Sequence, residues 1–399
     1  MKILMLSWEY PPRIVGGLAR HVYWLSKYLA MKGLEVHVVT LSEGDSDYTE
    51  LVEGVHVHRV NSYQIPSPDF TSWVHQFNYA MIKRGIEIVK NRNIDLIHAH
   101  DWLVAHASIV LKHVFRIPLV VTIHSTEYGR RGGIHNEFER HIHEIEWLLT
   151  YEAWKIIVCS NAMKHEVIRV FAAPEDKVHV IPNGFNALKE PASNYINYVK
   201  SKYCITNSNK VVLFVGRLVY EKGIHILLQA ISSLAPQYPE IKTIIVGEGP
   251  MRNELEQMTY RLGIRDKVIF TGFINDDELS ALYHIAYVAV FPSLYEPFGI
   301  VALEAMSASK PVIVSDVGGL SEIVISEKTG LKIRPNNVYD LIDALSYILN
   351  NEGVAHSMGK AGKEYVFKNY TWDKISKSTI NIYEKVLAEY RMSSWKPFT

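Results

Sequence analysis

The loop at 216–223 carries two basic residues whose types and spacing suit the binding of a diphosphate. It reads GRLVYEKG and follows the apolar run VVLFV. Arg217 offers a planar fork of donors and Lys222 a point charge, so the two side chains can grip one diphosphate from two sides. Two ordinary basic residues on a solvated loop fit this segment equally well when it is taken alone.

The segment EPFGIVALE, at 296–304, holds two carboxylates eight positions apart in apolar company. Such a pair invites comparison with glycosidases, in which one carboxyl acts as acid and the other as nucleophile. Glu304, however, falls inside a predicted helix, where a carboxylate can accept two hydrogen bonds from the vicinal hydroxyls of a ribose. Its apolar neighbours argue against the alternative, an exposed helix residue. For Glu296 the alternative is an acidic turn residue.

Two glycine pairs each follow a predicted strand and precede a predicted helix. The first lies in IVGGL at 14–18 and the second in VGGLSEIV at 317–324. Without side chains, the backbone amides of such a pair can approach an anion at a helix N-terminus, where the helix dipole favours negative charge. Most glycine pairs only make turns, so either pair alone is a weak sign of an anion site.

Histidine and aspartate residues end two consecutive predicted strands. His124 ends the run PLVVTI, and Asp101 ends the strand before it, within the motif HAHDW. A histidine in this position is most often structural, and the chain has 18 histidines. His98 and His100 alternate as two metal ligands could, but no third ligand is evident. The acidic triplet DSD at 45–47 lies in a polar loop with other acids and is interpreted as chance, so no metal site is predicted.

These residues lie on a chain in which apolar, β-branched runs alternate with helical patterns twice over. Near-continuous apolar strands separated by helices predict a parallel sheet covered on both faces. The predicted fold class is therefore α/β, with two doubly wound, Rossmann-like parallel-sheet domains. Ligands of such sheets bind at the carboxyl ends of the strands, so a cleft between the domains is the expected site.

The expected strands lie at 2–7, 35–41, 55–60, 95–99, 118–123, 155–159, 177–181, 211–215, 242–246, 268–271, 288–291, 311–314 and 331–333. Helical patterns lie between several of the strands of the first half, for example at 19–31 and 77–90. In the second half and beyond it, the expected helices lie at 225–234, 252–262, 277–285, 301–308, 339–349 and 372–390. A polar stretch at 189–209 separates the two halves.

The composition is that of a globular protein large enough for two domains. The chain has 399 residues, of which 48% are hydrophobic and 21% charged. Lysine plus arginine and aspartate plus glutamate both number 42, which argues against a nucleic-acid partner. Two cysteines give no disulfide framework, no signal peptide is evident, and no apolar run is long enough to span a membrane. A cytoplasmic setting without membrane association is therefore expected.

The motifs together, and in this order along the chain, resemble those of glycosyltransferase family 4, the retaining enzymes of GT-B fold. They are the N-terminal GGL, IPNG at 181–184, GR-x4-KG, EPFG with E-x7-E, and GGLSEIV. The resemblance spans nearly the whole chain. It implies an N-terminal acceptor-side domain at 1–187 plus 375–399, to which the last helix crosses back, and a nucleotide-sugar donor domain at 188–374.

The resemblance also implies roles for single residues. Arg217 and Lys222 would hold the diphosphate, His124 would contact the donor sugar near its reacting carbon, and Glu296 would read sugar hydroxyls; these four form the implied catalytic set. Glu304 would hold the ribose. The implied donor-binding residues are Gly16, Gly17, Gly216, Glu304, Phe298, Gly299, Ile300, Gly247, Gly249, Phe273 and Ile274, and those on the acceptor side are Asp101 and Arg13.

The implied activity is the metal-independent transfer, with retention, of a hexosyl group from a nucleotide sugar. A UDP- or ADP-sugar would be the donor, the group first of all glucosyl, and an α-glucan or oligosaccharide the acceptor; no cofactor is implied. The segments SWEYPP, RIVGG, HDW and TIHSTEYGR are most similar to the short glycogen-synthase-like members. Those members usually carry a lysine two residues before the glycine pair, where this chain has Ile14, with Arg13 just before it.

Several alternatives stay open. The acceptor could be a sugar phosphate, as in sucrose-phosphate or maltosyl-phosphate synthesis, or a lipid-linked glycan. A nucleotide-sugar epimerase and a non-catalytic nucleotide-sugar binder share the two-domain shape. A dehydrogenase is disfavoured because no G-x-G-x-x-G follows the first strand. The oligomeric state has no signature in the sequence.

Overall fold

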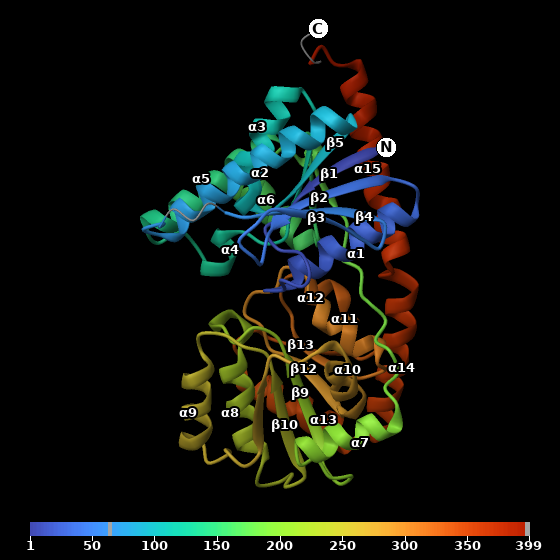
Figure 1. The fold of residues 1–399 in the computed structure, drawn as a ribbon. Helices are drawn as coiled ribbons and strands as arrows, with labels where there is room; N and C mark the ends of the chain where they lie inside the picture. The colour runs from blue at the N-terminus through green and yellow to red at the C-terminus, as the bar shows by residue number, and fades with distance from the viewer. Residues whose placement is uncertain (63–65, 396–399) are drawn as a thin grey trace. The chain divides into compact units, whose positions relative to one another are not determined.

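The computed structural model describes residues 1–62 and 66–395, which form two compact units (Figure 1). Unit 1 comprises Met1–Gly184 and Trp372–Thr399, and unit 2 comprises Phe185–Thr371. The chain passes between the units beside the boundaries expected at 187 and 375. Every expected strand is present, with its ends shifted by no more than one residue.

The sheet of unit 1 has eight strands among the described residues, in the order β3-β4-β2-β1-β5-β6-β7-β8. All neighbours pair in parallel except β3 and β4, which are antiparallel. The sequence pattern missed β3 because this edge strand, YTELV, is largely exposed. The strands are β1 (Lys2–Leu6), β2 (Glu35–Leu41), β3 (Tyr48–Val52), β4 (Val55–Val60), β5 (Leu96–His100), β6 (Leu119–Ile123), β7 (Lys155–Val158) and β8 (Val178–Val180).

Helices cover both faces of this sheet (Figure 1). On one face, α1 (Gly17–Met31) packs against α15 (Trp372–Met392) over a shared core with the sheet. The buried residues of α1 recur every three or four positions, the spacing of one helix face. On the other face, α2 (Phe70–Arg92), α3 (Ala105–Phe115) and α5 (Glu137–Glu152) pack along one another. The shorter elements are α4 (Glu127–Arg131), α6 (Asn161–Phe171) and the 3₁₀ turns Trp102–Val104 and Glu175–Lys177.

The last helix belongs to the core of unit 1. From α15, Ile375, Ile382, Tyr383 and Val386 are buried with residues of β1, β2 and α1. The motif IPNG ends against the first residue of this helix: a Cβ on Gly184 would lie 2.5 Å from the Trp372 ring, so only glycine lets the ring lie on the backbone.

The sheet of unit 2 has six parallel strands in the described chain, in the order β11-β10-β9-β12-β13-β14. Counted from the first strand of the unit, this is the 3-2-1-4-5-6 order of a doubly wound dinucleotide-binding sheet, and the winding reverses between β9 and β12. The strands are β9 (Lys210–Val215), β10 (Ile241–Val246), β11 (Val268–Gly272), β12 (Val288–Phe291), β13 (Val312–Ser315) and β14 (Gly330–Ile333).

Two helices of unit 2 were not expected from the sequence. The polar stretch at 189–209 contains α7 (Ser193–Lys202), of which only Val199 is fully buried, so the helix has no broad apolar face to reveal it. The other is α14 (Glu352–Asn369), whose buried face is formed largely by Ala355, Gly359 and Gly362 and therefore gives a weak apolar pattern. The remaining helices are α8 (Ile224–Leu234), α9 (Arg252–Arg261), α10 (Asp276–Ile285), α11 (Ile300–Ser307), α12 (Gly318–Ile323) and α13 (Val338–Asn350), with a 3₁₀ turn at Tyr220–Lys222.

The two ends of unit 2 lie side by side. The Phe185 amide donates to the Tyr370 carbonyl at 3.1 Å, and Phe185 and Thr371 form an isolated parallel bridge. Unit 2 is therefore closed on itself. Within residues 1–62 and 66–395, no helix has both the length and the apolarity needed to cross a bilayer.

Candidate active site

Lys222 and Glu296 form an ion pair where the strand order of unit 2 reverses. Lys222 lies in the loop after β9 and Glu296 in the loop after β12, and these strands are neighbours in the sheet. Lys222 Nζ donates to Glu296 Oε2 at 2.6 Å, and only 23% and 10% of the two side chains are exposed. The carboxylate therefore holds the ammonium in one place. The sequence pointed to both residues but not to their pairing.

Three predicted donor-binding glycines interlock at the ends of β9 and β10. The Gly216 amide donates to Val246 O at 3.0 Å. A Cβ on Gly247 would lie 2.0 Å from Gly216 O, and one on Gly249 would lie 2.4 Å from Leu218 O. The glycines are therefore required for the loops to touch backbone to backbone. This packing presents the exposed Arg217 guanidinium on a fixed loop.

The predicted donor-binding residues Phe273 and Ile274 follow β11. The Gly247 amide donates to Gly272 O at 3.0 Å, which ties this segment to the loop after β10. Phe273 is 71% exposed, whereas Ile274 is half-buried. An aromatic ring this exposed can stack on a flat ligand.

Glu304 is buried inside α11, with 4% of the residue exposed. The prediction that its apolar neighbours rule out an exposed position is confirmed. The Tyr283 hydroxyl donates to Glu304 Oε2 at 3.1 Å. A buried carboxylate is costly unless it is hydrogen-bonded, so this acid is held in place by α10.

The second glycine pair packs the acid-bearing loop against α12. Gly318 has φ +49° and the Gly319 amide donates to the Glu296 carbonyl at 3.0 Å. A Cβ on Gly318 would lie 2.0 Å from that same carbonyl oxygen. Phe298 is buried beside this contact and Ile300 begins α11. The motif GGLSEIV thus has a packing role that positions Glu296.

In unit 1, three histidine rings converge beside the ends of β5 and β6. His100 ends β5, His124 follows β6 and His21 lies on α1. His100 Nδ1 and His124 Nε2 are 3.2 Å apart, and ligand nitrogens of all three rings lie within 4.8 Å of one another. His21 Nδ1 contacts Asn183 Oδ1 of the IPNG motif at 2.8 Å. From the sequence, His124 was given a role in the site and His100 was considered only as a possible metal ligand with His98. His21 was missed because it arrives from a distant segment.

Three such nitrogens could ligate zinc. The sequence had shown only two candidate ligands, His98 and His100. The prediction of no metal rested on the lack of a third ligand, a premise that the convergence of His21 and His124 on His100 removes. That the protein needs no metal stays a prediction, and activity measured with and without EDTA tests it.

The histidines of this cluster are neutral at pH 7. Burial lowers the pKa of His124 to about 3 and the pKa values of His21 and His100 well below their usual range. Asp101 Oδ1 accepts from the His124 amide at 2.7 Å, and burial raises the pKa of Asp101 to about 6. Asp101, predicted on the acceptor side, therefore fixes the backbone of His124.

Two further carboxylates, which the sequence analysis missed, lie next to this segment. Glu127 accepts from Arg130 Nη2 at 2.8 Å and from Arg131 Nε at 3.2 Å. Glu146 accepts from the Glu127 amide at 3.0 Å, and Arg130 is 3.7 Å away. Burial raises the pKa of Glu146 to about 8, against the opposing effect of Arg130. Glu146 is thus protonated at neutral pH.

Replacing Glu146 by glutamine is expected to remove a fall in the stability of unit 1 with rising pH. The folded chain keeps the proton up to about pH 8, whereas the unfolded chain releases it near the ordinary value of 4.5. Stability from this group is therefore greatest below about pH 4.5 and declines as the pH rises through that window. The gain in melting temperature of Glu146→Gln over wild type should grow between about pH 5 and pH 8. Glu144→Gln, an exposed change on the same helix, is the control; a constant difference would contradict the assignment.

Backbone amides at the first glycine pair, Gly16 and Gly17, already bind a carboxylate of the same chain. Glu9 is buried, and its Oε2 accepts from the amides of Val15 at 2.6 Å and Gly16 at 3.3 Å. Gly16 caps α1, and Gly17 is its exposed first residue. Glu9 was missed because a lone acid before two prolines has no recognisable spacing. The role expected for Gly16 and Gly17 with a donor stays a prediction.

Known protein families and relatives match this chain over nearly its whole length. The family model "Glycosyltransferase Family 4" matches residues 15–187, and "Glycosyl transferases group 1" matches residues 199–365. A glycogen synthase of Mycobacterium tuberculosis is 35% identical over 96% of this chain and 94% of its own length. The chain belongs to glycosyltransferase family 4. An uncharacterized family relative from Methanocaldococcus jannaschii, itself described as a glycosyltransferase, is 42% identical over 96% of this chain and 98% of its own.

Solved structures agree with this membership. The sucrose-phosphate synthase of Thermosynechococcus elongatus superposes with a TM-score of 0.84 at 26% identity, covering 97% of this glycosyltransferase and 99% of that chain. The resemblance to the family and the GT-B fold, both inferred from the motifs, are confirmed. The protein is therefore a glycosyltransferase with two Rossmann-like domains.

Proposed function

We propose that this glycosyltransferase moves a glucosyl group, with retention, from UDP- or ADP-glucose to an α-glucan, without a metal ion. The observation that carries the proposal is the Lys222–Glu296 pair at the reversal point of a dinucleotide-type sheet, with Arg217 on the same loop. Two cations there suit the diphosphate of a nucleotide sugar. The likeness to a glycogen synthase over nearly the whole chain supports the choice of acceptor.

Negative charge grows on the β-phosphate as the sugar leaves. Lys222, held by Glu296, and Arg217 stabilise that charge without a catalytic metal. The bond from the anomeric carbon to the phosphate oxygen breaks, and the bond from the acceptor oxygen forms on the same face. The acceptor proton passes to the leaving phosphate. Glu304 binds the ribose, and the neutral His124 ring contributes hydrogen bonds to the sugar rather than charge.

The product is expected to keep the anomeric configuration of the donor. Attack and departure on one face leave an α-linked sugar α-linked. Proton NMR of the first product formed from an α-linked nucleotide sugar reads the anomeric coupling directly. A β-linked product would rule out this front-face route.

A panel of donors and acceptors tests the proposed activity as a whole. UDP-, ADP- and GDP-sugars are incubated with maltodextrin, hexose phosphates and lipid-linked acceptors, with and without EDTA. Glucosyl transfer to maltodextrin that withstands EDTA is expected. Loss of activity in EDTA with recovery on adding zinc would instead assign the His21, His100 and His124 cluster to a metal.

A sugar phosphate is the second candidate acceptor. The observation in its favour is the superposition on a sucrose-phosphate synthase along the whole chain. Transfer to hexose phosphates and not to maltodextrin in the same panel would favour it. Donor binding without any turnover would favour a non-catalytic binder, and conversion of the sugar without transfer an epimerase.

A further inference from the structure

Arg59 of β4 is a buried arginine that the candidate active site does not use. Only 1% of it is exposed, and it is the largest fully buried side chain in the described part of the chain. Its Nη1 is buried with no hydrogen-bond partner among residues 1–62 and 66–395. A buried cation is costly, and apolar side chains of similar volume often replace it without loss of stability. The contacts that Arg59 makes are therefore the guide to its role.

The Arg59 guanidinium joins an edge strand of the sheet to the loop between β1 and α1. Its Nε donates to Glu50 Oε1 of β3 at 2.6 Å, and its Nη2 donates to the Pro11 carbonyl. It also lies over the rings of Tyr10 and Tyr48, at 5.9 Å from each ring centroid. Arginine can bind a carboxylate and a carbonyl in two directions at once because its donors form a planar fork, which lysine lacks.

The loop that Arg59 contacts has few anchors of its own. It reads EYPPRIVGG, at 9–17, where the two prolines have no amide hydrogen to donate and the two glycines have no side chain. Glu9 fixes the end next to α1, because its Oε2 accepts from the Val15 and Gly16 amides. Arg59 fixes the middle of the loop from the side of the sheet. Two buried charged side chains therefore set where the glycine pair lies.

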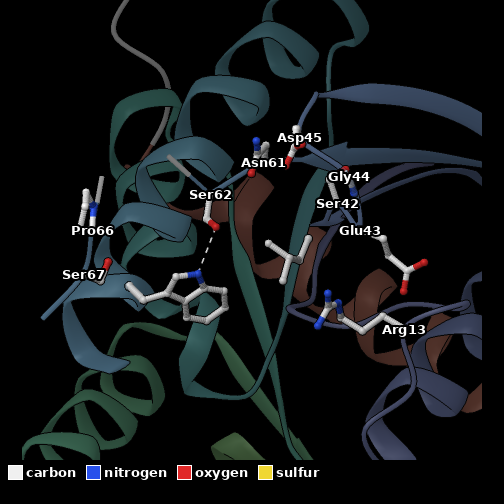
Figure 2. Close-up of a pocket in the computed structure, with 11 residues that line it drawn as sticks. Arg13, Ser42, Glu43, Gly44, Asp45, Asn61, Ser62, Pro66 and Ser67 are labelled. Carbon is white, nitrogen blue, oxygen red and sulfur yellow. Dashed lines mark hydrogen bonds between the residues drawn. The ribbon is translucent and has the colours of Figure 1, made fainter. Parts of the chain in front are cut away.

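The same loop carries Arg13, which Figure 2 shows beside an open pocket of about 560 Å³. The pocket lies where β2 and β4 end, and Asn61, two residues after Arg59, is part of its lining. The Arg13 amide donates to the Tyr10 carbonyl at 3.1 Å, one residue before the carbonyl that Arg59 binds. The position of Arg59 therefore bears on the glycine pair and on Arg13 together.

We propose that Arg59 is a positioning residue for sugar transfer, which holds the 9–17 loop where the backbone of the glycine pair binds the diphosphate of the donor. The proposal rests on the proposed function, because the donor is what gives the glycine pair its role. It goes beyond that function by making the β3–β4 hairpin part of the reaction. Glu50, whose side chain is 39% exposed at the edge of the sheet, orients the Arg59 guanidinium toward the loop.

A double variant tests the proposal without leaving a buried charge unpaired. Arg59→Met with Glu50→Gln removes both members of the ion pair, so the fold is expected to survive. KM for the nucleotide sugar that wild type uses is expected to rise by roughly 10-fold, the scale of one hydrogen bond to a charged group. A purely structural role would lower kcat through a smaller folded fraction and leave this KM unchanged. An unchanged KM for the donor in the folded double variant would overturn the proposal.

The matched control is a second double variant, Arg84→Met with Glu87→Gln. It removes an arginine–glutamate pair of the same unit that lies within α2, with Nη1 2.9 Å from Glu87 Oε2. KM for the nucleotide sugar should stay within about twofold of wild type, because the pair is remote from the 9–17 loop in the fold. An equal rise in KM in this control would show that the effect is not specific to Arg59.

Hydrogen exchange measures the hold of Arg59 on the loop without any donor. Exchange of the Val15 and Gly16 amides is expected to be roughly 10-fold faster in the Arg59→Met, Glu50→Gln variant than in wild type, because the loop opens more often. Equal exchange would overturn the proposal even if wild type turned over no donor, a result by which the proposed function alone would fail. Faster exchange with an unchanged KM for the donor would mean that Arg59 holds the loop but positions nothing for the reaction.

Discussion

Replacing Lys222 by alanine is expected to lower kcat for sugar transfer by about 10²–10³, the usual loss for one preorganised charge-stabilising donor. The Nζ of Lys222 is held 2.6 Å from Glu296 Oε2, so the cation is in place before charge develops on the leaving diphosphate. KM for the acceptor should change little, because the interaction strengthens only as the sugar leaves. Steady-state kinetics with saturating donor measures the effect.

The matched control is Lys328→Ala, which removes an exposed lysine of the same unit. A structural rival predicts that Lys222→Ala merely destabilises unit 2 by leaving Glu296 without its cation. The double variant Lys222→Ala with Glu296→Gln separates the two, since it removes the unpaired carboxylate. If the double variant regains wild-type kcat, the lysine is structural and the diphosphate role is wrong.

Replacing Glu304 by glutamine is expected to weaken binding of the nucleotide sugar by roughly 10- to 100-fold. This is the scale of about 1.5–3 kcal/mol for a hydrogen bond to a charged group. The substitution keeps the shape of a side chain that is 4% exposed and so avoids the cavity that alanine would leave. Calorimetry with the nucleoside diphosphate that binds wild type reads the loss.

The ribose can be tested directly by pairing this variant with a deoxynucleotide. Wild type should bind the 2′-deoxy or 3′-deoxy diphosphate more weakly than the ribonucleotide, and Glu304→Gln should lose most of that difference. Tyr283→Phe, which removes the 3.1 Å bond to Glu304 Oε2 but no carboxylate, is the control. Full discrimination retained by Glu304→Gln would place the ribose elsewhere.

The strands were predictable because most are buried on both faces and therefore read as continuous apolar runs, such as KVVLFV in β9. The elements that escaped notice lack that signal. In β3 most residues are exposed, and in α7 a single valine is fully buried, so local patterns carry little information there. Those elements form because tertiary contacts with β4 and α10 select them.

For the site, residue types and loop positions could be predicted, but partners could not. Lys222 and Glu296 lie 74 residues apart and His21 and Asn183 lie 162 apart, so no spacing rule links them. Their pairing follows from strand order, which brings β9 beside β12 in unit 2 and places β1 between β2 and β5 in unit 1. The burial that makes Glu146 a weak acid is likewise a property of the assembled core.

The return of α15 to unit 1 also has a consequence for how the protein is made. Unit 2 is continuous in sequence and can close, with Phe185 bonded to Tyr370, before the helix that begins at Trp372 has packed onto unit 1. Until then the face of the first sheet that Ile382 and Val386 will cover stays open to solvent. The inner half of the chain can therefore close first during synthesis, and the half that begins the chain is the last to finish folding.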